Sequence, residues 1–302
     1  MEKLTTLNDT TAQDRPRSRV FDMVELTKPR LTILSVLTTL AGFYLASRGE
    51  FEVTQLLSVL AATFLVGGGC GALNMVIESE YDAQMKRTSR RPIAAARTTR
   101  WEGTLLGIAL LVAGHIWLGL SSNLLAVFFA LLTTITYLFF YTPMKRISPL
   151  NTLVGAFPGA LPPLIGWSAA TGEIGWGGVA LFILLFFWQM PHFLALAWMY
   201  RKDYERAGYR MLPSVDPHGD ATSRQILLYS AALLPVSLIP AIVGLSGAIY
   251  LIGALLLSLA FTLTGFRFLR DRTNGAARTV FHFSLIYLPI LLLLMVVDGP
   301  HF

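Results

Sequence analysis

The sequence predicts an all-α, polytopic membrane protein with nine membrane-spanning helices. Of its 302 residues, 54% are hydrophobic and only 14% are charged, too few charges for the surface of a water-soluble domain of this length. Apolar runs of roughly 17 to 23 residues recur along the whole chain, each long enough to cross a hydrocarbon core of about 30 Å. These spans are expected to be helices, because a helix satisfies its own backbone hydrogen bonds in lipid.

Two long connections stand out among the nine spans. The spans are expected at residues 31–47, 55–77, 103–120, 124–141, 151–170, 177–199, 226–243, 248–268 and 279–297. The long connections follow the second and the sixth spans, four helices apart, which hints at two four-helix halves plus a ninth helix. We expect a cytoplasmic N-terminal tail at 1–25 and a single nine-helix domain at 26–300.

The distribution of basic residues predicts the orientation in the membrane. With nine crossings, only Arg48 among the 24 Lys and Arg residues falls on the side opposite to the others. By the positive-inside rule the N-terminus is then cytoplasmic and the C-terminus external. The net charge of +6 therefore reflects topology rather than nucleic-acid binding. The tail carries acids and no apolar core, which favours a bacterial cytoplasmic membrane over a transit peptide or signal peptide.

An acidic stripe follows the second span. On a helix Asn74, Glu78 and Asp82 are spaced i, i+4, i+8, so each side chain rises about 6 Å and turns only about 40° from the last. Carboxylate and amide oxygens are ligands that Mg²⁺ accepts while it bridges to phosphate oxygens. A solvated helix end would also carry acids. The stripe, however, begins inside the apolar span, where polar groups are costly.

Basic side chains follow the stripe closely. Arg87 and Arg91 belong to the first long connection, and "YTPMKR" places Tyr141, Lys145 and Arg146 at the end of the fourth span. Anchoring by the positive-inside rule would explain these residues equally well. The functional alternative is that arginine supplies paired donors to the oxygens of a diphosphate.

A second polar region surrounds the end of the sixth span. Asp203 lies beside Lys202 and could complete a metal site from the other half of the chain. If this span continues as a helix, His192 shares a face with Asp203 and lies about 16 Å deeper. His192 belongs to "WQMPHF", where it, Trp188 and Gln189 interrupt an apolar run. A packing role and a ligand role for His192 both stay open.

Six stretches, in order, are similar to those of protoheme IX farnesyltransferases, or heme O synthases, in the intramembrane aromatic prenyltransferase (UbiA) superfamily. The resemblance covers nearly the whole chain. The stretches are "LTKPR" at 26–30, residues 74–92, "YTPMKR" at 141–146, "GALPPLIGWSAATG" at 159–172, "WQMPHFLALAW" at 188–198 and "DYERAGYRMLP" at 203–213.

The resemblance implies nine helices around a central cavity capped by cytoplasmic loops. It also implies transfer of the farnesyl group of farnesyl diphosphate to a vinyl group of heme B, with addition of water, giving heme O. Two acidic motifs would hold Mg²⁺: Asn74, Glu78 and Asp82 in the first, Asp203 in the second. The second is incomplete, because Ala207 stands where relatives that act on quinone precursors carry another acid.

The remaining site residues would bind the two substrates or assist the reaction. His192 would ligate or position heme, or transfer a proton. A heme A synthase is a partner that the sequence neither requires nor excludes. The substrate-binding residues would be Arg87, Arg91, Tyr141, Lys145, Arg146, Trp188, Gln189 and Lys202.

Two other functions are alternatives for a chain with these features. A prenyltransferase acting on a phenolic or quinone ring is disfavoured by "WQMPHF" and by the missing second acid. A secondary transporter would place its carboxylates near the midplane of the bilayer. Here the acids cluster at one surface, which disfavours transport.

Overall fold

Nine helical segments within the described residues, 18–299 of this computed structural model, are long and apolar enough to cross a membrane. This agrees with the predicted fold class, and no β-strand occurs in that part of the chain. Five spans are single helices: α2 (Pro29–Ser47), α3 (Val53–Asp82), α4 (Arg100–Ser121), α14 (Ala248–Asp271) and α15 (Asn274–Val297). A sixth, α9, covers Trp176–Met199.

The other three spans are composite. The fourth contains α5 (Leu124–Ile135), the π-helical turn η1 (Thr136–Tyr141) and α6 (Thr142–Ile147). The fifth is divided at Leu161 into α7 (Asn151–Ala160) and α8 (Pro162–Thr171), where Pro162 supplies no backbone N–H. The seventh contains α12 (Asp220–Val236) and α13 (Ile239–Ile242).

A short helix occupies part of the segment that we assigned to the N-terminal tail. Helix α1 (Arg19–Leu26) is capped by Ser18, whose hydroxyl accepts a hydrogen bond from the backbone N–H of Phe21 at 3.2 Å. Asp22 on its buried face accepts a bond from Arg97 Nε at 2.9 Å. This ion pair fixes α1 to the connection after α3. Residues 1–17 lie outside the described part.

The buried apolar residues form two main clusters, one for each part of the chain. The first joins α2, α3, α4, α5 and α8, and the second joins α9, α12, α14 and α15. The division is therefore five spans against four, rather than two groups of four plus a ninth. The fifth span belongs to the first group because glycines let it approach α2: a Cβ at Gly166 would lie 2.0 Å from the backbone oxygen of Thr39.

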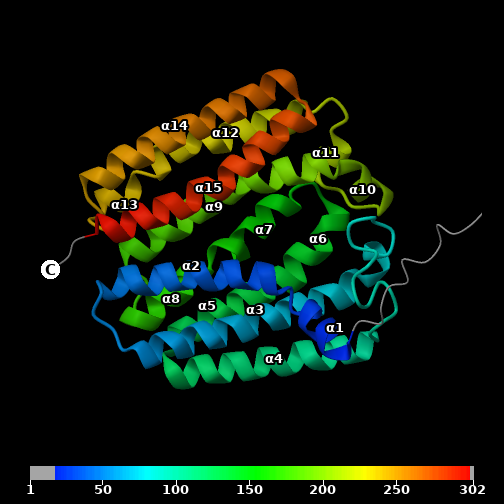
Figure 1. Cartoon of the computed structure of the whole chain (residues 1–302), viewed down its shortest axis with the longest axis horizontal. Helices are drawn as coiled ribbons and strands as arrows, with labels where there is room; N and C mark the ends of the chain where they lie inside the picture. Colours follow the sequence, from blue (N-terminus) through cyan, green and yellow to red (C-terminus); the bar gives the residue numbers. More distant parts are fainter. Residues whose placement is uncertain (1–17, 300–302) are drawn as a thin grey trace, which may run out of the picture.

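The polar segments gather at one end of the bundle. Figure 1 shows α1, α6, the connection after α3 and the short helices α10 (Arg201–Arg206) and α11 (Leu212–Val215) at the same end. Helix α3 continues to Asp82, beyond the apolar run, and so carries its acidic residues to this end. The last turn of α15 lies at the opposite end, as an odd number of spans requires.

Candidate active site

The acidic stripe lies on α3 as the spacing predicts. Asn74, Glu78 and Asp82 are all at least 95% buried. Glu80, which lies on another face of the helix, is exposed and pairs with Arg100, also exposed, at 3.2 Å. Burial of two carboxylates is costly unless cations pair with them, so the surroundings of the stripe decide what it can do.

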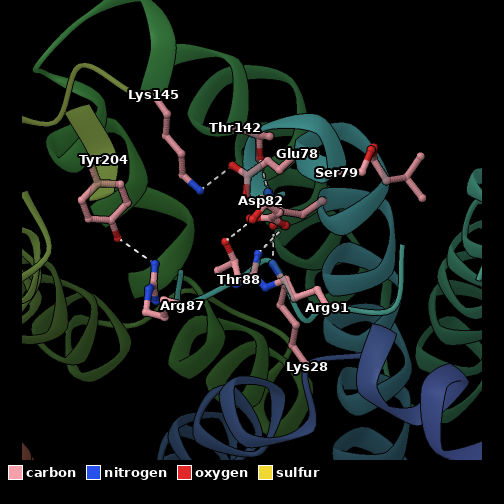
Figure 2. A network of polar contacts seen from close by, with 12 residues as sticks. Lys28, Glu78, Ser79, Asp82, Arg87, Thr88, Arg91, Thr142, Lys145 and Tyr204 are labelled. Atoms are coloured by element: carbon pink, nitrogen blue, oxygen red, sulfur yellow. Dashed lines mark hydrogen bonds and ion pairs between the residues drawn. The ribbon is translucent and has the colours of Figure 1, made fainter. Parts of the chain in front are cut away.

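Each member of the stripe has a basic partner from a different element. Lys145 of α6 contacts Glu78 Oε1 at 2.6 Å, and Arg91 of the connection contacts Asp82 Oδ2 at 2.7 Å. Lys28 donates a hydrogen bond to Asn74 Oδ1. Figure 2 shows these three basic side chains around the end of α3. Lys145 and Arg91 were predicted site residues; the role of Lys28 was missed, although it lies in the quoted "LTKPR".

Lys28 reaches the stripe through an unusual backbone conformation. It precedes Pro29 at the start of α2 and has φ 49° and ψ 55°, in the left-handed region, which is uncommon for a residue with a side chain. Gly71 of α3 allows the approach, since a Cβ there would lie 3.0 Å from the backbone oxygen of Thr27.

The environment of Lys28 also changes its acidity. Burial, and secondly the neighbouring Arg91, lower the pKa of Lys28 to about 7.

The π-helical turn and the first connection supply further contacts. Asn74 Nδ2 donates to Thr142 Oγ1 at 3.0 Å, directly after η1, and π-helical turns are frequent at functional sites. Thr88 Oγ1 donates to the backbone oxygen of Asp82 at 2.9 Å. Both threonines lie in the stretches quoted for the family resemblance, 74–92 and 141–146, but neither was predicted to be a site residue. Burial alone would lower the pKa of Arg91, but the adjacent Asp82 holds that pKa above its usual value.

Aromatic rings support the basic residues of the fourth span. Lys145 Nζ lies 4.6 Å from the centre of the Tyr141 ring, and the Arg146 guanidinium lies 4.3 Å from the Tyr81 ring. Cation–π contacts of this kind hold a basic group in place without neutralising its charge. Of these residues, Lys145 contacts the stripe directly through Glu78, whereas Arg146 is exposed and lies against Tyr81; their binding of an anion stays a prediction.

Asp203 has a different environment. Helix α9 ends at Met199, and Asp203 lies on the separate helix α10, so the face that we expected it to share with His192 does not exist. Its carboxylate accepts a bond from Arg206 at 3.2 Å. Lys202 is exposed. In the described part of the chain, no group of three or more His, Cys, Asp and Glu side chains converges on a metal position.

The two long connections nevertheless touch each other. Arg87 donates to the Tyr204 hydroxyl at 3.0 Å and lies 5.1 Å from the centre of the Tyr200 ring, as Figure 2 shows for Tyr204. Met85 and Ala207 are buried in a common apolar cluster. Arg87, a predicted site residue, thus links the connection after α3 to the helix that carries Asp203. A shared metal ion between the two acidic motifs remains a prediction.

The α3 stripe has the donors that Mg²⁺ requires. Asp82 Oδ1 is buried and has no hydrogen-bond partner among the described residues, and such an acceptor is unfavourable unless something binds it. Glu78 and Asn74 present further oxygens on the same face. This set of hard oxygen ligands fits Mg²⁺.

The residues of "WQMPHF" lie deeper in the bundle and connect three helices. Gln189 Nε2 donates to the backbone oxygen of Ala156 on α7 at 2.7 Å. Trp188 Nε1 donates to the backbone oxygen of Ser284 on α15 at 2.8 Å, and His192 Nδ1 lies 2.7 Å from the hydroxyl of the same serine. Ser284 was missed, because one serine in a long apolar span is no signal by itself.

Fold and site together define a class: an integral membrane protein of nine helices with a buried, charged site at one end of the bundle. The model of the UbiA prenyltransferase family matches residues 35–287, and the chain belongs to this family. It is 44% identical to the protoheme IX farnesyltransferase of Solibacter usitatus, with 92% of this chain and 99% of the relative covered. It is 42% identical to that of Koribacter versatilis, with 92% and 93% covered.

Solved structures show the same fold at low sequence identity. A digeranylgeranylglyceryl phosphate synthase superposes with a TM-score of 0.78 at 19% identity, covering 92% of this chain and 98% of that one. A UbiA homologue from Archaeoglobus fulgidus bound to GPP and Mg²⁺ superposes with a TM-score of 0.65 at 16% identity, covering 91% and 99%. At these identities the likeness concerns the fold alone.

Proposed function

We propose that this protein transfers the farnesyl group of farnesyl diphosphate to a vinyl group of protoheme IX, giving heme O and diphosphate. The observation that carries the proposal is the α3 stripe, whose buried carboxylates are surrounded by Lys28, Arg91 and Lys145 at one end of an apolar bundle. Such a site suits a substrate with an anionic head and an apolar tail. The named relatives at 44% and 42% identity support the choice of substrates.

The basic residues would bind the diphosphate. Lys28, Arg91 and Lys145 come from three elements, so together they can contact a diphosphate from several sides, and Arg87 lies at the adjoining connection. Asn74, Glu78 and Asp82 would hold Mg²⁺, with Asp203 as the proposed ligand from the second motif. When bound, Mg²⁺ supplies Lewis-acid stabilisation of the charge that develops on the leaving diphosphate.

The reaction breaks the bond between the allylic carbon and the diphosphate oxygen, and the electron pair leaves with the diphosphate. The vinyl group of the heme then attacks the allylic cation, which forms the new carbon–carbon bond. The cation left on the heme side takes up water, and loss of a proton gives the hydroxyl group. Apolar walls suit this sequence, because they keep water from the allylic cation until the vinyl group has reacted.

The deeper residues would accept the heme. Trp188 and His192 lie on α9 within the apolar part of the bundle, away from the charged stripe, and both contact α15.

We place the protein in the bacterial cytoplasmic membrane with a cytoplasmic N-terminus and an external C-terminus. A heme A synthase, as the consumer of heme O, is the proposed partner.

Mass spectrometry of the heme extracted after expression tests the proposal. Cells that express the protein should contain heme with the added mass of one farnesyl group and one water, and purified protein should form it from heme B, farnesyl diphosphate and Mg²⁺. Incubation with 4-hydroxybenzoate in place of heme B is the control for action on phenols. Prenylated 4-hydroxybenzoate without heme O would overturn the assignment.

A further inference from the structure

The hydrogen bonds around His192 determine which ring nitrogen is available to a ligand. Ser284 Oγ donates its single proton to the backbone oxygen of Phe281, at 2.6 Å. At the contact with His192 Nδ1, which measures 2.7 Å, the serine oxygen can therefore only accept. This hydrogen-bond network assigns the proton to Nδ1, and in the neutral imidazole Nε2 then has the lone pair.

Aromatic rings fix the orientation of the imidazole. The Trp188 ring lies 5.4 Å from it at an angle of 25°, and the Phe281 ring lies 4.7 Å from it at 29°, both stacked. Trp188 and Phe281 stack on the imidazole ring, and Ser284 occupies the edge at Nδ1. The edge that contains Nε2 is therefore the one left for a ligand. Trp188 is itself held by its bond to the Ser284 backbone oxygen, so one residue of α15 fixes two residues of α9.

The exposed edge has no protein partner. Nε2 makes no hydrogen bond to the described residues, no carboxylate among them forms an ion pair with His192, and the side chain retains partial exposure although Ser284 is fully buried. A histidine that only filled space would gain by bonding both nitrogens. Here one nitrogen is bonded and the other is presented within an apolar region.

We propose that Ser284 is a positioning residue that holds His192 so that Nε2 binds the iron of the heme substrate. This inference rests on the proposed function and assigns the atom that recognises the heme. Metal-binding histidines usually donate their other N–H to a second group, which fixes the tautomer and the ring orientation. The contact between Ser284 and His192 has this form, and binding of the iron would anchor the heme deep in the bundle.

Heme binding by the purified protein, without farnesyl diphosphate, tests the inference. Bound heme B should show the iron–histidine band in resonance Raman spectra of the ferrous state, and His192→Gly should lose that band. Added imidazole should restore the band in His192→Gly by filling the space of the side chain. Ser284→Ala should weaken heme binding by about 10- to 100-fold, the range for loss of such supporting groups.

Two further variants separate positioning from packing. Ser284→Thr keeps a hydroxyl and should retain the band and most of the heme affinity. Ser258→Ala is the matched control: Ser258 is a fully buried serine bonded to the Tyr287 hydroxyl at 2.8 Å, and it does not contact His192. Its heme spectrum should equal that of the unmodified protein. Affinity for farnesyl diphosphate should be unchanged in all of these variants.

The outcomes distinguish this inference from the proposed function. The proposed roles of His192 and Ser284 would be overturned if His192→Gly kept the same iron–histidine band as the original protein. They would also be overturned if Ser284→Ala bound heme with unchanged affinity. If those results accompany normal heme O formation, the proposed function stands and the pair acts otherwise, for example in proton transfer. Absence of heme O from the unmodified enzyme would instead overturn the proposed function and this inference with it.

Discussion

The two acidic motifs differ in how the protein compensates their charge. Asp82 is buried at the end of a 30-residue helix and is paired with Arg91, whose own side chain is mostly buried. Asp203 lies on a six-residue helix and pairs with Arg206, whose side chain is 51% exposed. Two motifs that look equivalent in a sequence can thus contribute differently to the stability of the fold. The first is part of the buried core, whereas the second lies on the connection between α9 and α12.

The largest expected effect concerns activity, where the two motifs should behave alike. Asp82→Ala and Asp203→Ala should each lower pyrophosphate release by about 100-fold or more, because each would remove a proposed Mg²⁺ ligand and with it stabilisation of the leaving diphosphate. Pyrophosphate release in detergent or in vesicles measures this. Glu80→Gln is the matched control, since this exposed acid on α3 faces away from the stripe. Near-normal turnover of Asp203→Ala would restrict the metal site to α3.

Stability should separate the motifs. Asp82→Ala leaves Arg91 partly buried without its carboxylate, and loss of one partner of a buried pair costs about 3–5 kcal/mol. Asp203→Ala removes a pair in which the Asp203 side chain is 18% exposed but Arg206 is 51% exposed, so solvent screens the pair and its contribution should be about 1 kcal/mol or less. Thermal unfolding of the detergent-solubilised variants should therefore show a clear decrease for Asp82→Ala only. Equal decreases would mean that the motifs are equally integrated into the fold.

The pair of Glu78 and Lys145 tests whether the stripe is a coupled unit. The single variants Glu78→Gln and Lys145→Met should each destabilise the protein, whereas the double variant should cost less than their sum. For groups in direct contact the coupling energy should be about 1–3 kcal/mol, measured by a double-mutant cycle on unfolding. Strict additivity would contradict the 2.6 Å contact.

The smallest effect concerns the approach of Lys28 to the stripe. Gly71→Ala places a Cβ 3.0 Å from the backbone oxygen of Thr27, which should displace Lys28 and weaken binding of farnesyl diphosphate, at an overpacking cost of roughly 1–3 kcal/mol. Gly119→Ala is the control, because the atom nearest to a Cβ at this α4 position belongs to the Val127 side chain at 3.5 Å, an ordinary contact that does not involve Thr27 or Lys28. Equal binding by the two variants would mean that Lys28 is not positioned by Gly71.

The sequence by itself determined the nine spans and the register of the acidic stripe. Both depend on local quantities: a helix of given length crosses the hydrocarbon core, and residues four apart share a face. The extension of α3 to Asp82 agrees with that analysis. The family resemblance, carried by six short stretches, is confirmed by the match over residues 35–287.

Only the tertiary structure decided which distant residues complete the site. Lys28 lies 46 positions from Asn74, and Ser284 lies 92 positions from His192, so no periodicity relates either pair. The break after α9 and the five-to-four division of the spans depend likewise on how helices approach one another. The approach of α8 to α2 and of Thr27 to α3 is permitted by Gly166 and Gly71, whose effect appears only when the backbone of the neighbouring element is in place.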